Sequence, residues 1–245
     1  MWLEGKRVLI TGGSRGLGRS LCVVFAREGA SVAFTYSTDQ EGAGETVNQV
    51  SVHGRPVVSA RASVLDRESM GQLVARCEAE WGGIDILVNN AGVSRVLPIA
   101  LLEEEDWDEL VDINLKGTYL TTRLVLRGMF RRRSGRILNI GSVAGIRPLE
   151  APVHYAASKA GVKGFTEALA KEVGRYGITV NCLAPGILEG GVGLSLPQYR
   201  LDEYLKHCAL GRVGTFEEVS EAAAFLVSDL NSYMNGGTLT MDGGL

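Results

Sequence analysis

The sequence RVLITGGSRGLG at residues 7–18 determines the fold that the rest of the chain must adopt. An apolar, β-rich run, Arg7–Thr11, leads into a glycine-rich turn, and an amphipathic helical pattern follows over Gly18–Glu28. Glycines let the backbone turn sharply and approach a ligand, and the helix N-terminus adds unpaired N–H donors and a partial positive charge. A glycine-rich turn can also serve packing alone, but at this place it predicts a site for the diphosphate of a dinucleotide. The residues expected to hold that group are Gly12, Gly13, Ser14, Arg15, Gly16 and Leu17.

Short apolar runs alternate with longer amphipathic stretches along the whole chain. The expected strands are Arg7–Thr11, Ser31–Tyr36, Arg55–Ala60, Asp85–Asn89, Arg136–Ile140, Ile178–Leu183 and Thr238–Met241. The expected helices are Gly18–Glu28, Glu41–Val52, Arg67–Trp81, Trp107–Arg131, Tyr155–Tyr176 and Phe216–Ser228. Strands that are apolar on both faces and separated by helices are typical of a parallel sheet covered on both sides. With right-handed crossovers, we predict one doubly wound α/β (Rossmann) domain over residues 1–245, built on a seven-stranded parallel sheet.

One long stretch, Gly186–Gly211, shows no clear periodicity. A loop of that length in a compact fold is often a functional lid, and we expect a substrate lid at about residues 186–211. Its apolar content would suit an acyl chain without being diagnostic. The residues concerned are Leu194, Leu196, Pro197, Tyr199, Leu201 and Tyr204.

Composition excludes several classes of protein. The 245 residues carry 25 Lys and Arg against 28 Asp and Glu, a net charge of −3, which argues against a nucleic-acid-binding surface. No signal-peptide pattern and no apolar run approaching ~18 residues is present, so we expect a cytoplasmic protein without membrane contact. The cysteines (Cys22, Cys77, Cys182 and Cys208) form no CxxC pair and the three histidines are scattered, which favours reduced, buried thiols and no metal site.

The choice between NAD and NADP depends on the end of the second expected strand. A ribose 2′-hydroxyl is usually held by an acidic residue about 20 residues after the glycine turn. Here the sequence is Thr35-Tyr36-Ser37-Thr38, and the first acid is Asp39. Arg15 could instead pair with a 2′-phosphate, although it could also be a solvated surface residue. We therefore predict NADP(H), with Ser37 among the residues that bind the cofactor.

Tyr155 and Lys159 are four residues apart, so on a helix they share one face. An ammonium near a phenol stabilises the phenolate and is expected to lower the tyrosine pKa from about 10. Reduction of a ketone needs a proton donor at the oxygen, and Tyr155 would be that donor. Ser142, just after an expected strand, would hydrogen-bond the carbonyl oxygen. Such a Tyr/Lys pair is also common on solvated helix faces, and the adjacent His154 points roughly 100° away around the helix, as a bystander.

Five features occur together: TGGSRGLG at 11–18, NNAG at 89–92, Asn114, Ser142 and YAASK at 155–159. Together they resemble the short-chain dehydrogenase/reductase family over essentially the whole chain. Within that family the stretches DILVNNAGVSR, GRILNIGSVAG and YAASKAGVKGFTEALAKEV resemble the 3-oxoacyl-[acyl-carrier-protein] reductases. The resemblance implies an NADPH-dependent reductase of 3-oxoacyl thioesters in fatty acid biosynthesis. The alternatives are an enzyme for another alcohol or ketone (polyketide, sugar, steroid or small hydroxy compound) and a non-catalytic cofactor-sensing or scaffold protein, which should have lost Tyr155 or Lys159.

The resemblance also assigns roles to particular residues. It implies a catalytic set made of Asn114, Ser142, Tyr155 and Lys159. In this set Lys159 also binds the nicotinamide ribose, and Asn114 holds a water that links Lys159 to solvent. Asn89 would mainly tie neighbouring strands together. The further cofactor contacts are Ser63 and Val64 at adenine, Asn90, Ala91 and Gly92 along the adenine ribose, and Pro185, Gly186, Ile187 and Leu188 at the nicotinamide.

Two positions differ from the usual pattern of the family. Ser63 stands where Asp or Asn is usual, and Gly190 follows Pro185-Gly186 at the position where a threonine commonly grips the nicotinamide amide. Gly190 has no side chain to offer, so we expect a looser start of the lid and a lower affinity for the cofactor.

The resemblance implies two kinds of protein partner. Carrier proteins are acidic, so a basic patch is expected near the entrance of the site. Arg131, Arg132 and Arg133 form a candidate docking run, although a solvated helix C-terminus explains such a run equally well. A homotetramer is expected through the helices at Trp107–Arg131 and Tyr155–Tyr176 and through the C-terminal strand. The apolar stripe at this contact would be Leu115, Tyr119, Leu120, Leu124 and Phe130, part of which a monomer core would also explain.

Overall fold

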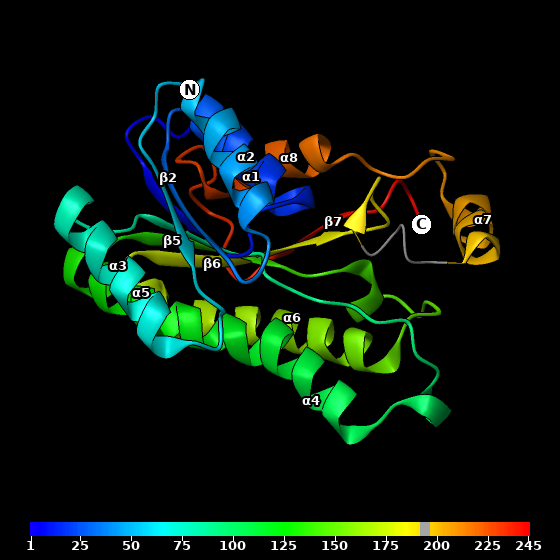
Figure 1. Ribbon diagram of the computed structural model, residues 1–245. Coiled ribbons are helices and arrows are strands. Elements are labelled where there is room, and N and C mark those ends of the chain that lie inside the picture. The colour runs from blue at the N-terminus through cyan, green and yellow to red at the C-terminus, as the bar shows by residue number, and fades with distance from the viewer. Residues whose placement is uncertain (192–196) are drawn as a thin grey trace.

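All the strands of the computed structural model, which describes residues 1–191 and 197–245, lie in one sheet. Their order is β3-β2-β1-β4-β5-β6-β7 and every pairing is parallel, which confirms the predicted doubly wound α/β fold with a seven-stranded sheet (Figure 1). The bounds are β1 Arg7–Ile10, β2 Ser31–Tyr36, β3 Val57–Arg61, β4 Ile86–Asn89, β5 Gly135–Ile140, β6 Ile178–Pro185 and β7 Thr238–Met241. The strand order reverses between β1 and β4, and ligands of such sheets bind outside the carboxyl ends of the strands at that point.

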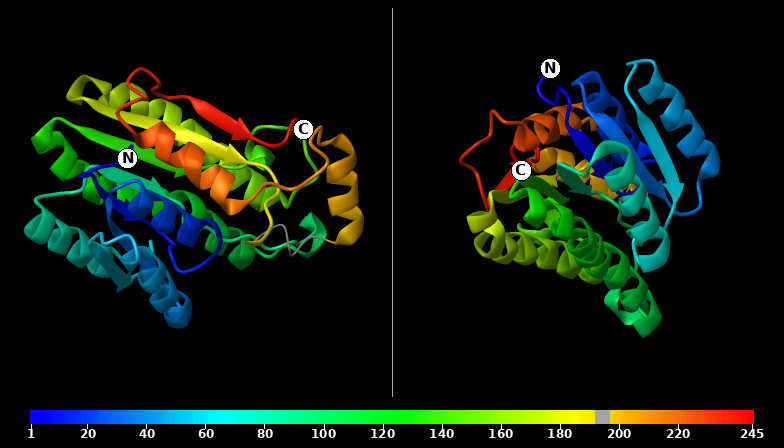
Figure 2. Two further views of the ribbon diagram at one scale, coloured as in Figure 1. Left: turned by 90° about the horizontal axis from the view of Figure 1, so that it is seen from above. Right: turned by 90° about the vertical axis from the view of Figure 1, so that its left-hand side faces the viewer.

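Helices cover both faces of the sheet. Helices α1, α2 and α8 lie on one face, and α3, α4, α5 and α6 lie on the other (Figures 1 and 2). Their bounds are α1 Gly16–Arg27, α2 Gln40–Ser51, α3 Arg67–Trp81, α4 Glu104–Val111, α5 Gly117–Arg132, α6 Val153–Val173, α7 Gln198–His207 and α8 Phe216–Val227. Within β1, Val8 and Ile10 enter the core under α1 and α8, whereas Leu9 enters the core on the opposite face. This alternation explains why the strands are apolar at consecutive positions.

The long helix expected over Trp107–Arg131 is two helices joined by a π-helical turn. Helix α4 ends at Val111, the π turn covers Asp112–Lys116, and α5 begins at Gly117. Gly117 gives room here, since a β-carbon at this position would collide with the side chain of Val64. Hydrophobic periodicity does not reveal a single wider turn, and such turns are frequent at functional sites. This one contains Asn114.

The stretch predicted as an unstructured lid contains a helix. Helix α7, Gln198–His207, lies beyond the carboxyl ends of the strands (Figure 2). This helix has few apolar and many charged residues, so its sequence shows no clear hydrophobic periodicity from which a helix could be predicted. Leu194 and Leu196, which the lid prediction included, lie outside the described residues.

Side-chain amides connect the two central strands with the helices below them. Asn89 at the end of β4 donates to Asn139 Oδ1 at 2.8 Å and to Thr122 Oγ1 at 2.9 Å, and Asn139 donates to Thr166 Oγ1 at 2.9 Å. The predicted role of Asn89 in tying neighbouring strands together is confirmed. All four cysteines are buried free thiols, as expected. Among the described residues, no helix combines the length and the apolar character needed to cross a bilayer.

Candidate active site

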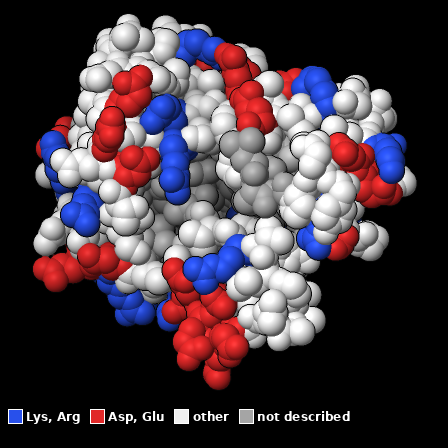
Figure 3. Space-filling model, turned by 45° about the vertical axis from the view of Figure 1, so that its right-hand side comes forward, with Lys and Arg blue, Asp and Glu red and all other residues white. Residues whose placement is uncertain are grey.

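A cavity of about 1730 Å³ opens at the carboxyl edge of the sheet. Figure 3 shows the surface hollowed on this side of the molecule, with both signs of charge around the hollow. The glycine turn, the ends of β2 to β6 and the start of α6 all contribute to its walls. Of the residues predicted to bind the cofactor or to catalyse, those that line it are Gly12, Ser14, Arg15, Gly16, Leu17, Ser37, Ser63, Val64, Asn90, Ala91, Gly92, Ser142, Tyr155, Lys159, Pro185, Gly186, Ile187 and Leu188.

The phosphate-binding turn has the backbone that its glycines predict. Gly12 and Gly16 adopt φ values of +72° and +53°, in the left-handed region that favours glycine. Arg15, the N-cap of α1, provides no side-chain cap, so the first N–H groups of α1 are left for a ligand at the cavity. These features fit the diphosphate of a dinucleotide. Gly13 is the exception among the predicted contacts, because it packs against Phe34, which would lie 2.7 Å from a β-carbon at this position.

The end of β2 carries no free acid. Asp39 caps α2, where its carboxylate accepts a hydrogen bond from Gly42 N at 2.9 Å. Arg15 is exposed, and both Arg15 and Ser37 line the cavity. Arg61, which the sequence argument missed, donates from Nε to the carbonyl of Ser37 at 3.1 Å. Arg61 follows no recognisable motif and reaches this point only because β3 pairs with β2.

Ser142, Tyr155 and Lys159 meet in the cavity, as predicted for a catalytic group. Lys159 Nζ lies 5.8 Å from the centre of the Tyr155 ring and donates to the carbonyl of Ile140 at 2.8 Å. Burial lowers the pKa of Lys159 to about 8. Burial also raises the pKa of Tyr155, against a smaller lowering by a hydrogen bond from Ser142. A lowered tyrosine pKa was expected from the sequence, and the structure gives the opposite direction because the effect of burial outweighs that of the hydrogen bond from Ser142.

Asn114 lies behind the cavity wall. Its Oδ1 accepts from Val93 N at 2.8 Å, and its Nδ2 donates to Val93 O at 3.0 Å and to Ser158 Oγ at 3.1 Å. Ser158 Oγ in turn donates to the carbonyl of Tyr155 at 2.8 Å. The π turn thus holds Asn114 between the segment after β4 and helix α6, which carries Tyr155 and Lys159. This arrangement gives Asn114 a positioning role, and the water-holding role implied by the family stays a prediction.

The main chain of the segment after β6 already forms hydrogen bonds with other parts of the chain. Ile187 N donates to Tyr204 Oη at 3.2 Å, and the carbonyl of Ile187 accepts from Gly214 N at 3.0 Å. Both main-chain polar groups of Ile187, one of the residues predicted at the nicotinamide, are therefore already paired within the chain. Tyr204 on α7, a tyrosine that the sequence analysis counted only as apolar lid content, fixes this segment by also donating to Asp242 O at 3.2 Å.

His154 does not share the cavity of Tyr155. It is fully buried and lines a separate cavity of about 180 Å³ with Ser94 and Asp106. The direction of its side chain agrees with the helical geometry predicted for it, and we assign it no part in the reaction.

The run Arg131, Arg132 and Arg133 is far from the cavity entrance. It ends α5 and immediately precedes the amino end of β5, whereas Ser142 follows the carboxyl end of the same strand, roughly 20 Å away. Each arginine already has a partner, respectively Glu78, the carbonyl of Ile84 and the carbonyl of Arg175. Within one chain the run therefore does not lie at the entrance of the cavity, because a parallel sheet sends this helix end to the opposite edge, and carrier-protein docking at these arginines stays a prediction.

The fold and the site together define an oxidoreductase that acts on CH–OH groups with a nicotinamide cofactor. The family model described as short chain dehydrogenase matches residues 6–197, and the chain belongs to that family. It is 40% identical to the 3-oxoacyl-[acyl-carrier-protein] reductase FabG of Chlamydia trachomatis over 99% of this chain and 98% of that protein. Its identity to the enzyme of the same name from Escherichia coli is 37%, over 100% and 99%.

Solved structures agree with this assignment. The crystal structure of levodione reductase superposes with a TM-score of 0.93 at 33% identity, covering 99% of this chain and 98% of that one. A short-chain dehydrogenase/reductase from Serratia marcescens superposes with a TM-score of 0.92 at 32% identity, covering 100% and 99%. The predicted family is confirmed.

Proposed function

We propose that this chain catalyses the NADPH-dependent reduction of a 3-oxoacyl thioester, linked to an acyl carrier protein or to coenzyme A, to the 3-hydroxyacyl thioester. The observation that carries the proposal is the meeting of Ser142, Tyr155 and Lys159 in the cavity that the phosphate-binding turn also lines. Full-length similarity to proteins named 3-oxoacyl-[acyl-carrier-protein] reductase supports this choice of substrate.

Tyr155 acts as the acid in this proposal. Because burial raises its pKa, the phenol stays protonated at neutral pH and can donate to the carbonyl oxygen as negative charge develops there. Ser142 hydrogen-bonds the phenol and orients the same oxygen. The chemistry that a nicotinamide cofactor supplies when bound is hydride transfer to the carbonyl carbon. The product is then the alcohol, with the hydride on carbon and the tyrosine proton on oxygen.

Lys159 supports the tyrosine electrostatically. One of its three donor protons is taken by the carbonyl of Ile140, which fixes the amine beside the ring of Tyr155. The positive charge stabilises the phenolate that remains after proton donation. Its other two protons are available for ribose hydroxyls.

The preference for NADPH rests on Arg15. Arg15 is exposed and lines the same cavity as Ser37, and its guanidinium would neutralise a 2′-phosphate there. Asp39, the first acid after β2, accepts a hydrogen bond from Gly42 N as the cap of α2. Arg61 holds the carbonyl of Ser37 and so stabilises this loop from the other side.

A second candidate is the reduction of a different ketone by the same residues. Two arginines at the cavity are paired with carboxylates: Arg147 with Asp242 at 2.9 Å and Arg200 with Glu150 at 2.5 Å. Paired arginines offer little free positive charge to an acidic carrier protein. A substrate without a carrier, such as a small ketone, would meet no such requirement.

Oxidation of NADPH by the purified chain tests both candidates. Acetoacetyl thioesters of carrier protein and of coenzyme A are compared with a panel of cyclic and linear ketones. We expect the thioesters to give the highest kcat/KM. The variant Tyr155→Phe should lower kcat by at least about 100-fold while it still binds NADPH. Turnover of ketones without turnover of thioesters would establish the second candidate instead.

Arg15→Ala should raise the KM for NADPH roughly tenfold and leave the KM for NADH unchanged.

A further inference from the structure

The first residue of α8, Phe216, lies between the two glycine segments that face the cofactor cavity. Its Cζ would be 3.5 Å from a β-carbon on Gly16, in the phosphate-binding turn, and 2.7 Å from a β-carbon on Gly190, after β6. The ring itself lines the cavity and is only partly exposed. It therefore occupies the space into which any side chain at position 190 would project.

The backbone at Gly190 is not what excludes a side chain there. Its φ lies outside the left-handed region, unlike that of the neighbouring Gly191 at +64°. Alanine could adopt this backbone, and among the described residues the three atoms nearest to a β-carbon at 190 all belong to the ring of Phe216. The glycine and the phenylalanine are thus two parts of one packing arrangement.

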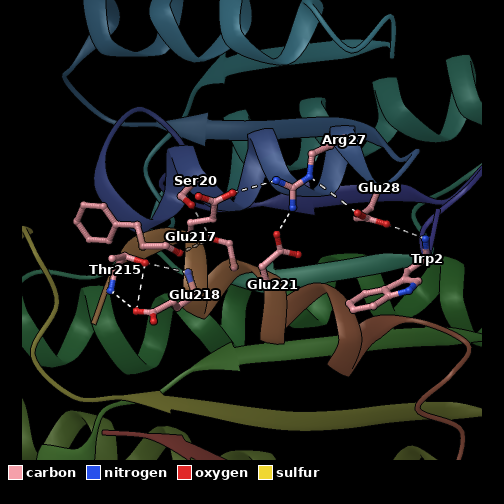
Figure 4. Close-up of polar contacts among 10 residues, drawn as sticks. Trp2, Ser20, Arg27, Glu28, Thr215, Glu217, Glu218 and Glu221 are labelled. Atoms are coloured by element: carbon pink, nitrogen blue, oxygen red, sulfur yellow. Dashed lines mark hydrogen bonds and ion pairs between the residues drawn. The ribbon is translucent and has the colours of Figure 1, made fainter. Parts of the chain in front are cut away.

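Hydrogen bonds join the segment that carries Gly190 to the start of α8. Glu189 Oε1 accepts from Phe216 N at 2.9 Å, and Glu189 N donates to the carbonyl of Gly214 at 2.9 Å. A capping box fixes the same helix end, with Thr215 Oγ1 accepting from Glu218 N at 3.1 Å and Glu218 Oε2 accepting from Thr215 N at 2.8 Å. Figure 4 shows this cap beside the contacts between α1 and α8.

Helix α8 is also held directly on α1, the helix that begins at the phosphate-binding turn. Ser220 Oγ donates to Ser20 Oγ at 2.8 Å, and Arg27 pairs with Glu217 and Glu221 (Figure 4). The ring of Phe216 therefore has little freedom relative to either glycine segment. A rigid apolar group at this place would cover a bound ligand and exclude water from it, which would strengthen the electrostatic contacts of the turn.

We propose that Phe216 is a binding residue for the dinucleotide, whose ring covers the cofactor between the phosphate-binding turn and the segment after β6 and replaces a side chain at position 190. The proposal rests on the cofactor binding described under the proposed function. It also reverses the expectation of a loose cofactor site at Gly190, because the missing side chain is compensated from α8.

A double-mutant cycle on cofactor affinity tests the proposal. The variants are Phe216→Ala, Gly190→Ala and the two combined, and the Kd for NADPH is measured by fluorescence titration without any carbonyl substrate. We expect Phe216→Ala to raise the Kd roughly tenfold, since a contact of aromatic size is lost. Gly190→Ala should raise it by a similar factor in the wild-type background, but by less than about twofold once the ring is removed.

Phe225→Ala is the matched control, since Phe225 is on the same helix and 41% exposed, with Trp2 as its aromatic neighbour. Its Kd should equal that of the wild type. An unchanged Kd for Phe216→Ala would overturn the proposal, whether or not its unfolding temperature falls, and so would equal effects of Gly190→Ala in both backgrounds. Either result would leave the proposed reductase activity standing. Failure of the wild-type chain to bind NADPH and NADH would overturn both.

Discussion

The chemistry of the site depends on how far single residues are removed from water. Burial of the Lys159 amine lowers its pKa from 10.5 to about 8. Tyr155 shifts upward for the same reason. The pair is therefore protonated at neutral pH, which is the state that an acid catalyst and its supporting cation require.

The pKa of Lys159 predicts the pH dependence of catalysis. The value of kcat/KM, which reports on the free enzyme, should fall as pH rises through about 8, because the amine loses its charge there. In Lys159→Arg any remaining activity should lack this fall, since a guanidinium stays charged. Lys163→Met is the control, because Lys163 pairs with Glu167 at the surface. A wild-type profile that stays flat from pH 7 to 9 would contradict this assignment.

The same shift has a consequence for stability. The folded chain holds the Lys159 proton less tightly than the unfolded chain does, so burial of the charged amine costs stability below about pH 8. That cost is relieved as pH rises from about 8 towards 10.5. The contribution of this residue therefore favours the folded state at high pH, opposite to that of a lysine in an ion pair.

At the level of helices and strands, buried side-chain amides hold the site in register. Asn139 lies in the middle of the chain of hydrogen bonds that joins β4, β5, α5 and α6, and none of its atoms is exposed. Helix α6 carries Tyr155 and Lys159, so its position against β5 sets their distance from Ser142. A chain of this kind is costly to interrupt, because each remaining amide loses a partner that water cannot replace.

Asn139→Ala should lower the free energy of unfolding by about 2–4 kcal/mol, since it leaves buried groups on Asn89 and Thr166 unpaired and opens a cavity. Urea denaturation measures the change. The matched control is Asn48→Ala on the exposed face of α2, which should change stability by less than about 0.5 kcal/mol. Equal unfolding midpoints for the Asn139→Ala and wild-type proteins would refute the structural role of the amide chain.

For the whole molecule, exposed apolar side chains bear on the predicted assembly. Of the proposed stripe, Leu120 is buried, and Leu124 and Phe130 pack into the core of this chain. Tyr119 remains 42% exposed on α5, and Trp107 is 39% exposed on α4. The apolar surface that these helices offer to another chain is thus smaller than the predicted stripe, because part of the stripe packs inside this chain.

Light scattering should give a mass near four times the 26.2 kDa of the chain. A charge placed on the exposed helix face, Tyr119→Asp, should reduce that mass, since a desolvated carboxylate opposes the contact. Val52→Asp, at the end of α2 and away from these helices, is the control and should leave the mass unchanged. A wild-type mass of one chain would contradict the tetramer.

The sequence by itself determined the order of the seven strands and of most of the helices, the glycine turn and the pairing of Tyr155 with Lys159. These depend on local periodicity and on spacing within one helix, which a chain carries in its residue order. Only the tertiary structure decided the direction of the Tyr155 pKa shift, the edge of the sheet at which Arg131 lies, and the contact between Gly190 and Phe216. Burial, sheet edge and contacts between residues distant in sequence depend on how the elements pack, and no local pattern encodes that packing.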